Sequence, residues 1–554
     1  MSNNLTLDIA NSSAETAERD WLDLSLAQQA VWLDAKLSGP SVYQLGGWAR
    51  VATPFDEDAV RQSVSLIMAR HDGLRLRVDD EMPRQWLDRS TDPPLTIVDL
   101  DGQSDPDEAF HAHVEKVFAT EMPLGDHPLF RIELIRAGPN LNFLLWRFHH
   151  LIADAGSVLI AGTDWLNAYQ ALTSGTPQEL APQSSYLGTI KSDAAYLDSA
   201  SYHQDLVYWM SRFDPLPPPL ISDMKVQASA VRGVSATGWA LEGEAFARFR
   251  ESARAAGTSA QRALFALCAM VMGRRYGQWD VVSGMALHRR DAANRHVIGM
   301  MAGVIAVRCH FNSSCSLVEG VQEFSEQVDA DLRHQRLPVD ILSRALGASG
   351  IGRTGLFEVA MSYIPAERGP VWSGDEAAMI TTGEVVSKEA SPISIHAAEL
   401  AAGNGLHVYV SVNTDFLDGA VAGTLASLFQ SALEEFVREP NRRIEDLESI
   451  LQSERVQVVE EWNQTQALFS QGRLEGLFSE QVCRTPDGLA VVGQDGVELS
   501  YAELEGRSTL LARHLVARGV RPGEVVGVRM ERSTETIVAL LAILKAGGVY
   551  LPLD

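Results

Sequence analysis

The sequence predicts a mixed α/β protein with two halves of similar size and a smaller third region. Apolar runs of strand length alternate with stretches of helical apolar spacing along the 554 residues. A proline-dense segment at 213–220 separates the halves, because proline continues neither a helix nor a central strand. A connector at 456–470 precedes a fresh α/β pattern. We therefore expect two α+β lobes around a central cleft, followed by a separate fragment.

These breaks set the expected domain boundaries. They are a flexible tail at 1–19, a first lobe at 20–212, a second lobe at 213–455, a linker at 456–470 and a last region at 471–554. The last region stops within Val549–Asp554, where a buried strand of a parallel sheet is expected. We therefore expect it to be a truncated domain.

The composition is that of an ordinary globular protein, with 46% hydrophobic and 21% charged residues. The formal net charge is −26, from 46 Lys and Arg against 72 Asp and Glu. Such an acidic surface repels phosphate backbones and anionic lipid. Neither nucleic acid nor a membrane is therefore an expected partner. Four cysteines without CxxC spacing and a polar N-terminus favour a cytoplasmic location, and neither a disulfide framework nor a zinc site is expected.

Helical spacing in the first lobe starts at Leu24 and ends near Gly39-Pro40. A second helix is predicted over 57–69, with Asp56 as its N-cap. Residues 141–149, LNFLLWRFH, predict a buried strand, and a helix is predicted from about Gly156. In the second lobe, Thr258 is expected to cap a very apolar helix that ends near Arg274.

The remaining elements follow the same two periodicities. Further helices are predicted at 244–256, 317–334, 420–438, 501–518 and 534–546, and further strands near 281–287, 303–309, 357–363, 406–412 and 525–530.

The densest cluster of reactive side chains is HHLIADAG, residues 149–156. Two histidines end a strand, and Asp154 follows in the turn before a helix. That arrangement lets the His150 imidazole point into a cleft while the carboxylate holds the turn. Adjacent strand residues point to opposite faces, so His149 is predicted to be structural. No third ligand is apparent, so no metal is expected.

HHLIADAG resembles the HHxxxDG motif of nonribosomal peptide synthetase condensation domains, which have a chloramphenicol acetyltransferase-like fold of two lobes around a tunnel. Other motifs of the family stand in the expected order, and the resemblance covers about residues 20–455. They are Ser25–Trp32 (similar to SxAQxRxW), Arg70–Arg75 (RHExLR), Tyr196–Trp209 with its closing Tyr-Trp, Ile298-Gly299 with Val304 (IGxFxN), and His334-Gln335 (HQ).

The resemblance implies amide formation, in which a carrier-bound amine attacks an upstream acyl thioester. It gives His150 the central role, as base or as a hydrogen-bonding orienter of the amine. It implies that Asp154 braces its loop through an arginine. Arg290 is the best candidate, because 284–290 matches the GxPVxxR segment, and Arg289 is the alternative.

Three positions depart from the family pattern. Ala155 stands where the motif has glycine, and Gly156 is expected to supply the conformational freedom instead. Ser394 stands where some relatives carry an asparagine in the cleft, and it can still form hydrogen bonds. Met301-Ala302 replaces the usual phenylalanine region. Reduced activity, or a non-catalytic recruitment domain, is therefore the alternative to an active enzyme.

The last region resembles the beginning of an adenylation domain. Residues 499–504 are similar to the first motif, LTYxEL, and residues 544–554 to the second, LKAGxAYVPID. The nucleotide loop of that family is absent from this sequence, so adenylation is not expected. The order of condensation before adenylation argues against an epimerisation domain, and the two histidines argue against a heterocyclisation domain.

The condensation motifs begin about 20 residues after Met1, so we expect an acyl donor supplied in trans. The donor is predicted to be acyl-CoA or an acyl carrier protein, and the acceptor a downstream aminoacyl carrier domain. Such a starter domain would begin an N-acylated lipopeptide. It would use phosphopantetheine-tethered or coenzyme A thioesters and no covalently bound cofactor. A peptidyl donor from a separate synthetase subunit is the second possibility.

Overall fold

The computed structural model describes residues 19–38, 43–51, 55–138, 141–175, 185–221, 233–348, 355–365, 379–381, 391–400, 403–469, 471–494 and 496–554. The predicted tail lies outside these residues except for Arg19, as does the predicted helix end at Gly39-Pro40. The chain divides into two compact units, Met1–Arg455 and Val456–Asp554.

The first half of the larger unit is built on a five-stranded sheet in the order β12-β2-β7-β6-β5. Neighbouring strands are antiparallel except β5 and β6, which are parallel. Strand β12 comes from the second half of the sequence, so the two halves share this sheet. The strands are β2 (Gln44–Val51), β5 (Leu95–Asp99), β6 (Phe130–Gly138), β7 (Leu141–His149) and β12 (Met379–Thr381). A small separate sheet joins β1 (Leu22–Asp23), β4 (Arg84–Leu87) and β3 (Leu76–Val78).

Strand β7 is buried on both faces, which explains its continuous apolar sequence. Side chains alternate across a strand, so Leu144 and Trp146 lie on one face and Phe143 and Leu145 on the other. The first pair packs in one cluster with residues of α2 and α4, and the second pair with residues of α3. The predicted strand at 141–149 is confirmed. The helices are α1 (Leu26–Ser38), α2 (Glu57–Arg70), α3 (Pro106–Phe118) and α4 (Ala155–Ser174).

Three of these helices, α2, α3 and α4, start at aspartate caps, and that of α3 is Asp105. Asp56 accepts a hydrogen bond from the backbone N–H of Ala59, and α2 begins at the next residue, as predicted. Asp154 caps α4 in the same way through the backbone N–H of Ser157, so α4 begins at Ala155. The Asp154 side chain is consequently fixed at the junction of strand and helix.

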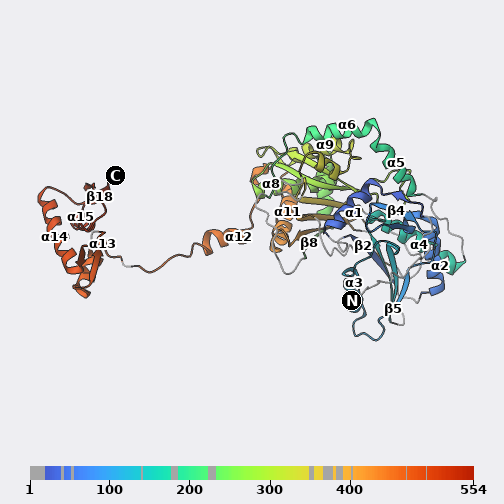
Figure 1. The fold of residues 1–554 in the computed structure, drawn as a ribbon, viewed down its shortest axis with the longest axis horizontal. Helices are drawn as coiled ribbons and strands as arrows, with labels where there is room; N and C mark the ends of the chain where they lie inside the picture. Colours follow the sequence, from blue (N-terminus) through green and yellow to red (C-terminus); the bar gives the residue numbers. More distant parts are fainter. Residues whose placement is uncertain are drawn as a thin grey trace, which may run out of the picture. The chain divides into compact units, whose positions relative to one another are not determined.

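The second half is built on a six-stranded sheet in the order β10-β9-β11-β13-β14-β8. Helix α8 is buried along most of its length and lies with α9 and α11 against this sheet (Figure 1). The bounds predicted for α11 are confirmed. The strands are β8 (Val234–Glu242), β9 (Asp280–Leu287), β10 (Gly303–His310), β11 (Val359–Ile364), β13 (Ile393–Glu399) and β14 (Gly405–Asn413), and the helices are α7 (Gly243–Ala255), α8 (Ala260–Tyr276), α9 (Leu317–Leu332), α10 (Val339–Ala345) and α11 (Ala420–Arg438).

The N-cap of α8 is Ser259 and not the predicted Thr258. The Ser259 side chain accepts from the backbone N–H of Arg262. The N–H of Thr258 is bound instead to Ala253 O at 2.9 Å, and therefore belongs to the end of α7. Gly257 makes this ending possible, because its φ of 77° lies in the left-handed region. The cap of the next helix therefore falls one residue later than predicted.

Helices α5 (Leu187–Leu197) and α6 (Ala200–Arg212) connect the two halves. Although α6 precedes the predicted hinge, it packs on the second half. The Tyr208 ring stacks on His334 with centroids 3.9 Å apart, and Trp209 Nε1 donates to His334 O at 2.9 Å. Trp209 also belongs to the core cluster of the second half. Two of the sequence motifs thus meet in space.

The smaller unit, Val456–Asp554, has its own helices and strands. Strands β15 and β16 form an antiparallel hairpin, and the two helices predicted at 501–518 and 534–546 follow it. Among the described residues β18 pairs only with β17, and all four of its residues are exposed, so its predicted burial is wrong. The elements are α13 (Leu474–Arg484), β15 (Leu489–Val492), β16 (Glu498–Ser500), α14 (Tyr501–Ala517), β17 (Val525–Val528), α15 (Thr534–Lys545) and β18 (Val549–Pro552).

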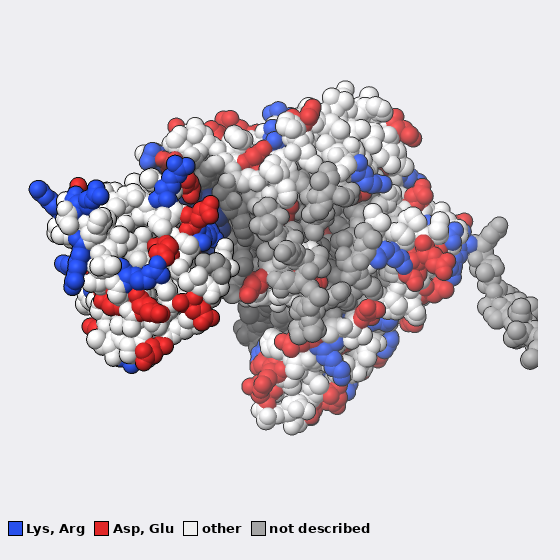
Figure 2. Space-filling model, turned by 60° about the vertical axis from the view of Figure 1, so that its left-hand side comes forward, with Lys and Arg blue, Asp and Glu red and all other residues white. Residues whose placement is uncertain are grey.

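The described surface carries charges of both signs. On the face in Figure 2, Lys and Arg lie interspersed with Asp and Glu. Within the described residues, no single helix has both the length and the apolar character needed to cross a membrane, although α7 and α8 meet that test as a pair bent by 88°.

Candidate functional site

The candidate site is built at the end of strand β7, where the chain turns into α4. His149 ends the strand, and residues 151–153 of the turn are fully buried. The backbone N–H of Ile152 donates to His149 O at 3.0 Å, and that of Val158 donates to Asp154 O at 3.1 Å. These bonds make the turn short and rigid, so the positions of the two imidazoles and the carboxylate are set by the backbone.

The two imidazoles have different surroundings. His149 is 0% exposed, its Nδ1 accepts from the backbone N–H of Leu151 at 3.1 Å, and burial, with a smaller effect of His150, lowers its pKa to about 3. His149 is therefore neutral at physiological pH. His150 is partly exposed, and its backbone N–H donates to Tyr43 O at 2.8 Å. Of the two histidines, only His150 has part of its surface exposed.

The Asp154 carboxylate is 1% exposed and fully occupied. Its Oδ2 accepts from Arg290 Nη1 at 2.6 Å and from the backbone N–H groups of Met301 and Ala302 at 3.1 and 3.0 Å. Its Oδ1 accepts from the Ser157 backbone N–H at 2.8 Å. Burial alone would raise the pKa of Asp154, but Arg290 and the Ser157 donors outweigh it, and the net shift is downward.

The predicted ion pair between Asp154 and Arg290 is confirmed. Arg290 is anchored further by Nη2, which donates to Val297 O at 3.2 Å. The alternative, Arg289, turns away and donates to Gln335 O. Its backbone has a φ of 48°, a left-handed conformation that is uncommon for a residue with a side chain. The two adjacent arginines thus bind different parts of the structure.

Ser157 extends the network and was not predicted from the sequence. Its Oγ lies 2.8 Å from both Asp154 Oδ1 and Gly299 O, and it accepts from the Gly299 N–H and from Arg290 Nη2, both at 3.0 Å. A serine one turn into a helix has no distinctive sequence signal. Its role arises only because the second half brings residues 297–302 against the start of α4.

Tyr186 holds the same segment from the other side. Its hydroxyl donates to Met300 O at 2.8 Å and lies 2.7 Å from Ser25 Oγ. A Cβ on Gly299 would come within 2.0 Å of the Tyr186 ring, so this glycine is required by space. The motif residue Gln28 also supports the site, since its Nε2 donates to Leu151 O at 2.9 Å. The motif at Ser25–Trp32 and the motif at Ile298-Gly299 therefore meet beside the histidines.

The motif at Arg70–Arg75 supports helix α4 through side-chain contacts. His71 Nε2 lies 2.8 Å from Asp164 Oδ2, and both side chains are buried. Asp72 accepts from the Tyr186 backbone N–H at 2.8 Å. These contacts tie the end of α2 to α4 and to the segment that carries Tyr186, so the motif acts on the site through the packing of its helices.

The structure corrects the expectation for Ala155 and Gly156. Neither has a positive φ, because both lie in the first turn of α4. Ala155 therefore needs no unusual dihedral angles, and Gly156 does not supply any. Gly156 matters for a different reason: a Cβ there would lie 2.9 Å from Arg290 Nη1, so the guanidinium would have to move from its place beside Asp154. Ser394 lies in β13, 2% exposed, paired in register with Ala360 and Ser411, and its predicted tunnel role stays a prediction.

A cavity of about 860 Å³ adjoins the site. It lies between helix α5 and the segment from β9 to Met301. Its wall combines thioethers, hydroxyls, amides and charged groups, among them Thr189, Asn294, Met300, Met301, Gln335 and Arg336. Met300 is the residue of this wall that reaches the histidine, since its Sδ lies 3.2 Å from His150 Nδ1.

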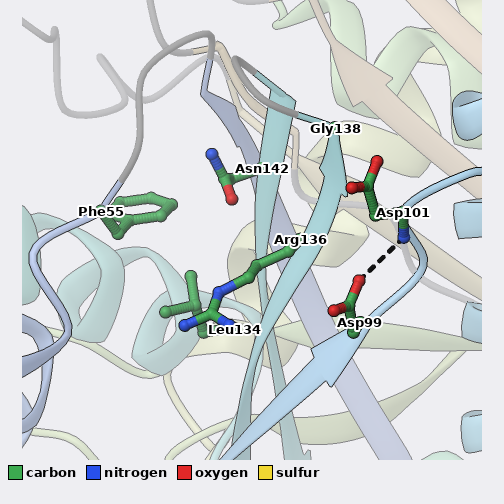
Figure 3. Close-up of a pocket in the computed structure, with 7 residues that line it drawn as sticks. All are labelled: Phe55, Asp99, Asp101, Leu134, Arg136, Gly138 and Asn142. Carbon is green, nitrogen blue, oxygen red and sulfur yellow. Dashed lines mark hydrogen bonds between the residues drawn. The ribbon is translucent and has the colours of Figure 1, made fainter.

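A second cavity, of about 250 Å³, lies at the ends of β5, β6 and β7. Asp99, Asp101 and Arg136 line it together with Phe55, as Figure 3 shows. Its polar groups are already engaged: Asp99 accepts from the Asp101 backbone N–H at 2.9 Å, and Arg136 pairs with Glu57. Both aspartates are exposed, so this cavity lacks the buried, positioned groups of the histidine site. Among the described residues, no group of three or more His, Cys, Asp or Glu is placed to hold a metal ion.

We predict that Asp154→Asn lowers the free energy of unfolding by about 3 kcal/mol at neutral pH, because Arg290 then keeps a buried charge without a partner. The folded-state pKa of Asp154 is lowered, so its stabilisation is complete above the unfolded value near 3.9 and disappears as pH falls through the folded value. The difference in the free energy of unfolding between wild type and variant should therefore become smaller below about pH 4. Urea unfolding followed by tryptophan fluorescence across this pH range measures it.

The control for this series is Asp126→Asn, which removes the exposed partner of Arg19. Exposed pairs contribute little, so its effect should stay within about 1 kcal/mol. If the difference in the free energy of unfolding between wild type and Asp154→Asn does not depend on pH, that result would contradict the ionised, ion-paired state of Asp154.

We predict that Gly156→Ala destabilises the protein by about 1–3 kcal/mol, because the new methyl group displaces the Arg290 guanidinium. The matched control is Ala155→Gly, the reverse one-carbon change at the neighbouring residue, which should cost about 1 kcal/mol or less. Thermal or urea unfolding of both variants measures the difference. Equal effects at both positions would rule out close approach as the reason for Gly156.

Comparison with known proteins agrees with this architecture. Residues 18–459 match the family model described as Condensation domain, and residues 478–554 match that of AMP-binding enzyme. The Dimodular nonribosomal peptide synthase of Bacillus subtilis (strain 168) is 24% identical over 535 residues, covering 96% of this chain and 22% of that protein. The chondramide synthase of Chondromyces crocatus is 25% identical over 552 residues, covering 97% and 14%. The chain thus spans less than a quarter of either relative.

Two solved structures share the fold. A mutant starter condensation domain of rhizomide synthetase RzmA, in complex with C8-CoA, superposes with a TM-score of 0.67 at 21% identity, covering 78% of this chain and 98% of that one. A four-domain nonribosomal peptide synthetase bound to AMP and glycine gives 0.77 at 18% identity, covering 96% and 42%. The predicted chloramphenicol acetyltransferase-like fold class is confirmed. The protein is therefore a member of the condensation domain family of nonribosomal peptide synthetases, an acyltransferase family, with part of an AMP-binding domain at residues 478–554.

Proposed function

We propose that this condensation domain joins an acyl thioester donor, supplied in trans, to the amino group of a carrier-bound aminoacyl thioester. The donor is acyl-CoA or an acyl carrier protein, and the acceptor is a downstream aminoacyl carrier domain. The product is an N-acylated aminoacyl thioester that begins a lipopeptide. The cytoplasm stays the predicted location.

The observation that carries the proposal is the pairing of one accessible imidazole with a rigid, fully satisfied carboxylate beside a cavity. His150 is partly exposed, whereas His149 is enclosed and neutral. Met300 links His150 to the cavity wall. The hydroxyl of Thr189, which donates to Met301 Sδ at 3.6 Å and can still accept, suits the amide-rich pantetheine arm, which needs hydrogen-bonding partners along its length.

In the proposed reaction, the amine nitrogen of the acceptor attacks the carbonyl carbon of the donor thioester. The C–N bond forms, the C–S bond breaks, and the thiolate leaves. His150 Nε2 takes the amine proton and returns it to the leaving sulfur. The attack needs no protein nucleophile, because the amine itself is the nucleophile. Holding both thioesters in one cavity lowers the entropic cost of bringing them together.

Starter function is favoured by a structural neighbour. A mutant starter condensation domain of rhizomide synthetase RzmA has been crystallised in complex with C8-CoA and Leu-SNAC. We carry the acyl-CoA donor over to this chain as part of the proposal. The peptidyl donor and the non-catalytic recruitment domain are the outcomes against which it is tested.

The test is amide formation followed by intact mass spectrometry. The protein is incubated with a carrier domain loaded in turn with each proteinogenic amino acid, and with octanoyl-CoA, an octanoyl carrier protein or a peptidyl carrier as donor. We expect amide from an octanoyl donor. His150→Ala should lower the rate by about 100-fold or more, since general-base catalysis contributes about 10²–10⁴-fold.

The matched control is His203→Ala, which removes an exposed imidazole on α6 and should leave the rate unchanged. Product from the peptidyl donor alone would replace the starter assignment by the peptidyl one. No product from any donor, or equal rates for wild type and His150→Ala, would exclude the catalytic role and favour recruitment.

A further inference from the structure

The thioether of Met300 lies against the imidazole of His150. Met300 Sδ is 3.2 Å from His150 Nδ1, and Met300 is only 7% exposed. The imidazole also meets the Tyr43 ring edge-on, with centroids 6.4 Å apart. The ring therefore has neighbours from both the first half and the second half.

The chemistry of the thioether decides which ring nitrogen carries hydrogen. A thioether sulfur accepts a hydrogen bond weakly and has no hydrogen to donate. If His150 Nδ1 carried the lone pair, it would face the sulfur lone pairs at 3.2 Å with no hydrogen between them. The contact is favourable only when Nδ1 carries the hydrogen, and a neutral imidazole then has its lone pair on Nε2.

We propose that Met300 is a positioning residue that holds His150 in the Nδ1–H tautomer, so that Nε2 is free to accept the proton of the attacking amine. This inference rests on the proposed function and adds to it the group that selects the reactive form of the imidazole. In many enzymes a carboxylate or a backbone carbonyl accepts from the second ring nitrogen. In this chain the acceptor is a sulfur.

The position of the sulfur is fixed by the backbone on both sides of Met300. Its own carbonyl accepts from the Tyr186 hydroxyl at 2.8 Å. The next two N–H groups, of Met301 and Ala302, donate to Asp154 Oδ2. The buried carboxylate therefore acts on His150 indirectly, because it anchors the segment that carries the sulfur.

The alternative is that Met300 is only an apolar part of the cavity wall. Met300→Leu separates the two roles, because leucine nearly conserves volume and apolar surface but cannot accept a hydrogen bond. Met300→Gln restores an acceptor, its amide oxygen, at a similar reach. Met68→Leu is the matched control, since Met68 is a fully buried methionine of the same core cluster.

We expect Met300→Leu to lower kcat by about tenfold, a part of the 10²–10⁴-fold that general-base catalysis supplies. The KM values for octanoyl-CoA and the aminoacyl carrier should stay within twofold. The two neutral tautomers hold the same number of protons, so their ratio is independent of pH. The loss should therefore persist across the plateau of the pH–rate profile. Met300→Gln should recover part of the loss, and Met68→Leu should match wild type.

Two kinetic results would overturn the inference: an unchanged kcat for Met300→Leu, or a change confined to KM. The tautomer is also read without turnover, from long-range ¹H–¹⁵N spectra of protein labelled with ¹⁵N-histidine. His150→Ala identifies the resonance. At a pH where the imidazole is neutral, wild type should show the Nδ1–H pattern, and Met300→Leu a mixture.

An Nε2–H pattern for His150 in wild type would overturn the inference whatever the activity. If wild type forms no amide with any donor, the proposed function fails, and the spectra alone then decide the role of Met300. The two claims therefore fail in different experiments.

Discussion

The buried carboxylate of Asp154 is the constraint on which the rest of the site depends. Removing one charge from water costs several kcal/mol. A carboxylate therefore stays ionised in the interior only when its oxygens accept enough hydrogen bonds or face a countercharge. Here Arg290 supplies the countercharge, and backbone N–H groups from Ser157, Met301 and Ala302 supply further bonds. Three of these four partners come from the second half of the larger unit. Satisfying one charge therefore joins the two halves at this point.

That junction explains why so much of the site is backbone. The segment 299–302 has little regular structure of its own, yet its peptide groups are held by Asp154, Ser157 and Tyr186. The imidazole of His150 then has a fixed neighbour in Met300. The Asp154 carboxylate therefore binds residues outside the turn that it caps. The motif aspartate organises the opposite wall of the site as well.

Much of this was predictable from the sequence, for reasons that can be named. Strand β7 is buried on both faces, so its continuous apolar run directly indicates a buried strand. Asp56 caps helix α2 through a contact with a residue three positions away, which a local pattern predicts. The pair of Asp154 and Arg290 was found through two family motifs, since nothing local joins residues 136 positions apart.

The elements and site residues that the sequence does not predict depend on tertiary contacts. Strand β2 contains two adjacent glycines, and edge strand β8 is largely exposed, so neither has a clear apolar pattern. Ser157, Tyr186 and Met300 are ordinary residues whose roles follow from what the other half brings to them. The motif glycine suggests dihedral freedom near Ala155, whereas the structure shows no positive φ there and a close approach of Arg290 to Gly156.

Amide hydrogen exchange in residues 297–303, followed by mass spectrometry, tests the central claim most directly. In wild type, the N–H groups of Gly299, Met301 and Ala302 should exchange slowly, because they are bound to Ser157 and Asp154. In Asp154→Ala this protection should disappear while that of the buried helix α8 is retained. Exchange in the wild-type segment as fast as in an exposed loop, or protection that survives the loss of Asp154, would contradict the account.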